Sequence, residues 1–160
     1  MARRISIAVT LIALLLFPAA AGAVFTLELN QTAMDFGDMD SGASGSYRDD
    51  IPHQGLEVLC TTDQGNPWWL RIRNEQPLTH ISNPSATIPN TNLKWYGVST
   101  SDPNNTSLVT LREDFTVEKT VYTAPAVETQ TTITMKFELT VPPVIQSGAY
   151  TSNIVFTLTE

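Results

Sequence analysis

The chain has 160 residues and a formal net charge of -7, with 42% hydrophobic and 16% charged residues. This length fits one domain, and the hydrophobic fraction argues against a disordered chain. The excess of acidic over basic residues excludes the basic face that nucleic-acid-binding domains present to phosphates. We therefore expect one folded domain that does not bind nucleic acid.

Residues 1–23 have the features of a secretory signal peptide. Arg3 and Arg4 precede an apolar stretch over 5–17, and small residues follow as far as Ala23, where the A-x-A pattern of a cleavage site ends. The stretch is shorter than the roughly 20 residues that a helix needs to cross a bilayer. We predict a helical leader that is cleaved after Ala23. The mature domain, 24–160, is then exported without a membrane span to the periplasm, the cell surface or the extracellular space.

After residue 23 the dominant pattern is the alternation of apolar and polar residues that is typical of half-buried strands. It is clearest over 132–141, where Ile133, Met135, Phe137 and Leu139 alternate with polar residues. We expect strands over 25–30, 33–36, 56–61, 68–73, 93–98, 107–111, 115–122, 132–141 and 150–159. The residues over 37–50 are expected to form a loop, and those over 74–92 a long connection. The pattern favours an all-β, antiparallel two-sheet sandwich of roughly seven to nine strands, with a closed barrel as the alternative.

Cys60 is the only cysteine of the chain, so no disulfide can form within it. It lies in the alternating run that starts at Leu56. We favour a buried thiol over half of an intermolecular disulfide.

The sequence contains no recognisable catalytic motif. The two histidines, His53 and His80, lie in loop-like segments, and no nucleophile elbow, zinc-protease helix or phosphate-binding loop is present. We predict a non-enzymatic protein without a cofactor. An unrecognised enzyme would instead be expected to have a pocket of polar side chains around His53 or His80.

Two further groups of residues are candidates for ligand binding. Asp38 and Asp40, with Asp49 at loop position twelve, partly match the spacing of a calcium loop. We favour a solvated acidic loop, and so no metal site, over calcium binding. Trp69, Trp95 and Tyr96 are candidates for an exposed aromatic platform that binds glycans, and a carbohydrate-binding β-sandwich module is the alternative function.

Three segments resemble the chaperone–usher pilins and the related spore coat protein U-like secreted domains. The stretch 147–159 resembles their closing G-x-Y-x-[DS] strand, 34–37 (Met-Asp-Phe-Gly) resembles their hydrophobic-Phe-Gly element, and 56–62 resembles their V-x-C-T strand. The resemblance implies an immunoglobulin-like sandwich that forms or decorates a surface fibre. It also implies partners: copies of the chain itself or other pilin-like subunits, and a periplasmic chaperone and usher.

Subunits of this kind polymerise when a spare alternating segment of one subunit completes the sheet of another. Phe25, Leu27 and Leu29 are the candidate donor residues. Either 25–30 is the donor and the fold starts at Ala33, or the domain is complete alone and does not polymerise in this way. We expect an exported structural or adhesive protein of the bacterial surface, either a pilin-like subunit or a component of a fimbrium, that acts through β-strand complementation.

Overall fold

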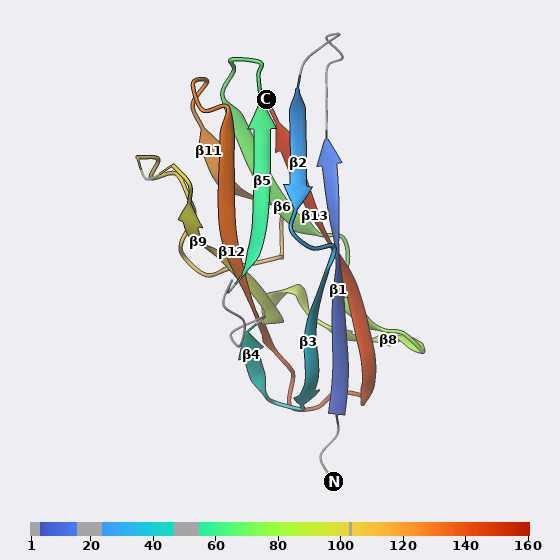
Figure 1. Ribbon diagram of the computed structural model, residues 1–160. Helices are drawn as coiled ribbons and strands as arrows, with labels where there is room; N and C mark the ends of the chain where they lie inside the picture. The colour runs from blue at the N-terminus through green and yellow to red at the C-terminus, as the bar shows by residue number, and fades with distance from the viewer. Residues whose placement is uncertain (1–3, 16–23, 47–54, 103) are drawn as a thin grey trace.

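The computed structural model describes residues 4–15, 24–46, 55–102 and 104–160, and within these ranges the chain is all-β. The described residues form thirteen strands, more than the seven to nine predicted, because short segments such as 44–46 and 78–80 also pair with longer strands. The strands form two sheets that face each other in a sandwich-like arrangement, and one short 3-10 helix, η1, covers Asn90–Asn92 (Figure 1). The described residues contain no helix long and apolar enough to cross a membrane.

The larger sheet has the order β11-β6-β13-β1-β3, and β7 and β8 extend it beside β13. Its strands are β1 (Arg4–Leu15), β3 (Ala33–Asp40), β6 (Trp68–Asn74), β7 (Leu78–His80), β8 (Asn83–Ile88), β11 (Lys119–Ala124) and β13 (Gly148–Thr159). The smaller sheet has the order β10-β9-β12-β5-β2, with β4 beside β12. Its strands are β2 (Phe25–Leu29), β4 (Ser44–Ser46), β5 (Leu56–Thr62), β9 (Leu93–Thr100), β10 (Glu113–Asp114) and β12 (Gln130–Thr140).

The core lies between the sheets and is built from every second residue of the long strands. On β12 the inward residues Ile133, Met135, Phe137 and Leu139 are fully buried, while the residues between them are partly exposed. This confirms the alternation predicted for 132–141. Cys60 is also fully buried, as predicted.

The N-terminal segment differs most from the prediction. The expected leader helix is wrong for residues 4–15, because they form β1, which runs parallel to β13 and antiparallel to β3. The larger sheet is therefore mixed, not purely antiparallel as predicted. A strand forms here because two long strands offer β1 their backbone hydrogen-bonding groups on both sides, and a helix would leave those groups unpaired.

Three other predicted segments differ for reasons of pairing. Residues 37–40 extend β3 instead of starting a loop, because β1 pairs with them. The connection over 74–92 contains the β7–β8 hairpin. Pro84 is tolerated there because, among the described strands, β8 pairs with β7 alone and so lies at an edge. Residues 107–111 form no strand. The Val109 carbonyl accepts a hydrogen bond from the Gly97 N–H of β9, and the Val109 N–H donates to the Val121 carbonyl of β11. The segment therefore links the smaller sheet to the larger one.

Candidate functional site

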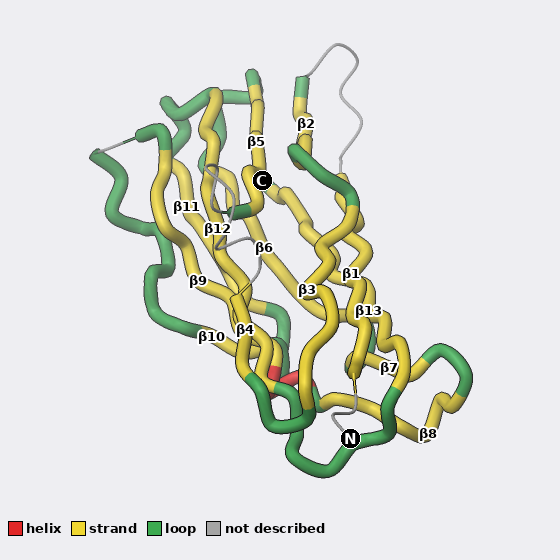
Figure 2. Tube along the Cα trace, turned by 60° about the horizontal axis from the view of Figure 1, so that its bottom comes forward, coloured by secondary structure: helices red, strands yellow, loops and turns green. Residues whose placement is uncertain are grey.

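The site proposed here is the position of β1 between β13 and β3, which we call the strand slot (Figure 2). On one side, β1 pairs in parallel with β13 in a continuous register from Ile5–Gly148 to Leu15–Leu158. On the other, it pairs antiparallel with β3 from Arg4–Asp40 to Thr10–Ala33. The Leu11 N–H adds a hydrogen bond of 2.9 Å to the Thr32 carbonyl. A segment with the composition of a leader thus forms a central strand of the larger sheet.

Over residues 5–11, the side chains of β1 alternate between core and solvent. The inward residues Ile5, Ile7 and Val9 are 0% exposed and Leu11 is 5% exposed. The outward residues Ser6, Ala8 and Thr10 are exposed. Fully burying an aliphatic side chain of this size stabilises a fold by about 1.5–3 kcal/mol, so these four residues contribute substantially to the core.

These four residues were not among the candidates derived from the sequence. The alternation of aliphatic residues with small or polar ones over 5–11 was the available signal. It was hidden because the same residues lie in the predominantly apolar stretch over 5–17 that indicates a leader.

The wall of the strand slot formed by β3 contains a β-bulge at the Met34–Gly37 element that resembles the pilin motif. Ile7 is opposite Gly37 and Ala8 is opposite Asp35, which leaves Phe36 as the extra residue. Gly37 has a φ of +67°, a left-handed conformation that glycine adopts without steric cost. Its N–H donates to the Asp35 carboxylate over 2.8 Å, and Phe36 packs against the core.

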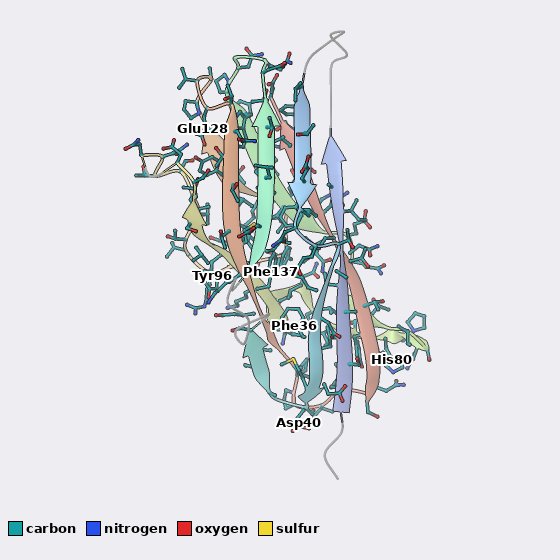
Figure 3. All side chains as sticks on the ribbon, viewed as in Figure 1. Phe36, Asp40, His80, Tyr96, Glu128 and Phe137 are labelled. Carbon is teal, nitrogen blue, oxygen red and sulfur yellow. The ribbon has the colours of Figure 1, made fainter. Side chains whose placement is uncertain are left out.

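The opposite wall begins at the Gly148-x-Tyr150 element of β13, which is held in place by His80, the residue labelled in Figure 3. The buried His80 ring lies edge-on to the Tyr150 ring, with centroids 5.1 Å apart. His80 Nδ1 accepts from the Ser82 N–H over 3.1 Å. Nε2 therefore carries the proton and donates to the Ser147 carbonyl, also over 3.1 Å. This arrangement fixes the start of β13, where it pairs with Ile5.

The candidate donor residues lie in β2, at the edge of the smaller sheet. Strand β2 pairs antiparallel with β5 from Phe25–Thr62 to Leu29–Val58. Phe25 and Leu27 are buried in the chain's own core, and Leu29 is partly buried against it.

The aromatic residues proposed as a glycan platform are not brought together. Trp95 is fully buried in the core. Trp69 lies on β6 of the larger sheet and Tyr96 on β9 of the smaller one, both partly exposed. Their neighbours Trp68 and Trp95 point inward, so Trp69 and Tyr96 face outward on opposite sides of the two-sheet structure. Tyr96 is covered by the Arg112 guanidinium, 5.0 Å above its ring.

Of the calcium candidates, Asp38 and Asp40 are exposed on the outer face of β3, and Asp49 lies outside the described residues. No three His, Cys, Asp or Glu side chains in the described ranges are placed so that they could hold a metal ion. His53 also lies outside the described residues, and His80 is buried as given above.

A shallow pocket of about 520 Å³ lies at the other end of the molecule. Its lining residues are Pro67, Asp102, Asn104, Asn105, Thr106, Thr123, Ala124 and Pro125. Behind it, the buried Glu128 carboxylate accepts hydrogen bonds from Tyr122 Oη over 2.7 Å, from the Thr131 hydroxyl and from Asn105 Nδ2 over 3.0 Å. Burial is the main cause of a raised pKa of Tyr122, and the hydrogen bond to Glu128 raises this pKa further. Every oxygen of this carboxylate is engaged, so the cluster fixes the turn before β12.

Comparisons with known proteins found no matching family model and no significantly similar curated protein.

Proposed function

We propose that the chain is an exported, non-enzymatic structural or adhesive protein of the bacterial surface, with an immunoglobulin-like sandwich completed by β-strand complementation. The strand slot is the observation that supports this function. Its occupant comes from the segment predicted to be a cleaved leader, and its removal would leave an empty strand position inside the sheet. The resemblance of 34–37 and 147–159 to pilin elements supports the same function, since these elements form the two walls of the slot.

The physical argument concerns the two edges that loss of β1 would create. Both β13 and β3 would then present unpaired N–H and C=O groups, and the apolar side chains beneath them would meet water. Unpaired strand edges act as templates for strands of other chains, and an extended segment that adds to such an edge gains main-chain hydrogen bonds and side-chain pockets. A processed chain of this kind is therefore expected to acquire a strand.

The experiment is to express the whole chain in a bacterium with an intact export pathway and to recover the processed protein under native conditions. We expect an N-terminus at Val24 and complexes that survive SDS without heating and dissociate on heating. A folded, processed protein that runs as a monomer under native conditions, without any other polypeptide, would contradict the proposed function.

A further inference from the structure

We propose that the processed chain is a strand acceptor that does not donate: its slot takes a strand from a different polypeptide, and β2 stays in its own sheet. This inference rests on the proposed function and concerns which chain provides the strand. The position that β1 occupies defines the side chains and the register of the strand that would fill the slot. The length of β2, its residue pattern and its pairing with β5 exclude it as that strand.

The first reason to exclude β2 is that it fits the slot poorly. The slot pairs with β1 from Ile5 to Leu15 along β13, whereas β2 covers only Phe25–Leu29. The slot buries four apolar side chains at alternate positions. Three of these could be matched by Phe25, Leu27 and Leu29, but the fourth position would receive Gln31. Burying an amide without a partner costs about 1–3 kcal/mol, so this substitute is poor at the end where Leu11 is buried.

The second reason is that β2 is fastened at both ends in its present place. At its start, the Val24 N–H donates to the Asp63 carboxylate over 2.8 Å and the Asp63 N–H donates to the Val24 carbonyl over 3.0 Å. At its end, the Asn30 N–H donates to the Glu57 carbonyl, and the Glu57 N–H donates to the Asn30 side-chain oxygen, each over 3.1 Å. Donation would break these bonds together with the β2–β5 ladder.

The third reason is that a chain of identical copies could not refill what donation empties. Each copy would gain a strand in its slot and lose β2 from the smaller sheet, which would uncover the buried core beneath Phe25 and Leu27. A strand from another polypeptide fills the slot and leaves β2 in place, so every strand position is occupied. The second arrangement buries more apolar surface and leaves fewer backbone groups unpaired.

The strand that fits is defined by the side chains it replaces. It runs parallel to β13 and presents four branched or large aliphatic residues at alternate positions, in place of Ile5, Ile7, Val9 and Leu11. Its outward positions are small or polar, as Ser6, Ala8 and Thr10 are. The bulge at Phe36 sets the offset between the strand and β3.

The test uses the full chain with a site for a specific protease inserted between Leu15 and Val24. Cleavage leaves residues 1–15 held only by the slot. The cleaved chain is unfolded in urea and refolded with an excess of fluorescent peptides, and the uncleaved chain serves as the refolding control. The peptides are 4–15, 24–32, 4–15 with Ile7→Asp and Val9→Asp, and 4–15 with Ser6→Asp and Thr10→Asp, each with the same solubilising tail.

We expect the 4–15 peptide and its outward-face variant to be retained at one per chain, and the 24–32 peptide and the inward-face variant to be retained at least tenfold less. Equal retention of the 24–32 peptide would overturn the acceptor-only inference and leave the proposed function standing. If the cleaved chain forms SDS-stable oligomers and Leu27→Asp abolishes them, the acceptor-only inference is also overturned and the proposed function again stands. If the uncleaved chain refolds but the cleaved chain retains no peptide, including 4–15, strand complementation itself fails.

Discussion

Ile7 of β1 lies opposite Tyr150 of β13 in the parallel ladder, and both side chains are fully buried. Tyr150 also donates its hydroxyl proton to the Gln146 carbonyl over 2.8 Å, and its ring meets His80. The residue from the N-terminal segment is thus packed beside a residue held in place at the start of the last strand. This arrangement links the filling of the strand slot to the stability of the larger sheet.

We predict that Ile7→Ala lowers the free energy of unfolding of the full chain by about 2–5 kcal/mol, because it leaves a cavity in a closely packed core. Ser6→Ala, on the exposed face of the same strand, should change it by no more than about 0.5 kcal/mol. Urea denaturation of the two variants and the parent measures both values. Equal effects would mean that β1 does not pack in the slot in solution.

Gly148→Ala is expected to destabilise the start of β13. A Cβ at this position would lie 2.1 Å from His80 Nε2, and the φ of +141° is itself unfavourable for alanine. Gly65 is the matched control, because it also has a positive φ, of +69°, but its added Cβ would meet nothing within 4 Å. We expect Gly65→Ala to cost about 1 kcal/mol, the backbone cost alone. Gly148→Ala should cost clearly more, and equal shifts in the thermal midpoint would contradict the contact with His80.

The thiol of Cys60 should be unreactive in the folded protein. Burial, with a smaller effect of the nearby Glu128 carboxylate, raises the pKa of Cys60 from its ordinary value of 9.0 to about 12. The folded protein therefore binds more protons than the unfolded chain between these two values, so this group makes stability fall as the pH rises through that window. Cys60→Ala should flatten that part of the pH–stability curve.

Labelling with a thiol reagent provides an independent measurement. We expect the rate of labelling of Cys60 at neutral pH to follow the fraction of molecules that open or unfold, and to rise by orders of magnitude in urea. Rapid labelling without denaturant would show that β5, or β2 where Leu27 pairs with Cys60, opens readily.

The Glu128 cluster gives a prediction about the end of the molecule away from His80 (Figure 3). Glu128→Gln replaces one acceptor oxygen by an NH₂ group, which cannot accept from Tyr122, Thr131 or Asn105. We expect a loss of about 1–3 kcal/mol in unfolding free energy. Glu28→Gln, at an exposed position on β2, should be nearly neutral. Similar denaturation midpoints for the two variants would mean that the buried hydrogen bonds do not stabilise the turn.

The ion pair between Arg112 and Glu138 predicts a dependence on acid pH. Arg112 Nε and a terminal nitrogen of its guanidinium donate to the two Glu138 carboxylate oxygens over 2.7 and 2.8 Å, and these bonds are the main cause of a lowered pKa of Glu138. A lowered carboxyl pKa stabilises the fold above the pKa of the unfolded chain, and this stability is lost as the pH falls through the folded value. Arg112→Gln should raise the Glu138 pKa in an NMR titration. The loss of unfolding free energy caused by Arg112→Gln should be present at neutral pH and should disappear at acid pH, where Glu138 is protonated in both proteins.

How well a strand could be predicted from the sequence depended on whether alternation was the only pattern in that segment. Strand β12 was predicted well because Ile133 to Leu139 alternate with polar residues and allow no helical face. In β1 the outward residues include Ala8 and Ile12, so alternation and a continuous apolar stretch coexist. Local sequence could not decide between them, because the deciding partners, β13 and β3, are distant along the chain.

The two walls of the slot illustrate the same division. The sequence singled out 34–37 and 147–159 by their resemblance to pilin elements, but it did not show that Gly37 forms a bulge opposite Ile7 or that Gly148 makes room for His80. Those roles depend on contacts between residues far apart in the chain.

The sequence by itself determined the all-β class, the buried lone cysteine and the inward face of the long strands, because period-two alternation is a property of a strand considered alone. Only the tertiary structure decided that residues 4–15 lie in a sheet, that β1 and β13 run parallel, and that Trp69 and Tyr96 face away from each other. Strand pairing is a choice of partner and direction, and backbone hydrogen bonds form equally well for many partners. The choice is therefore made by the packing of the whole core and not by any one segment.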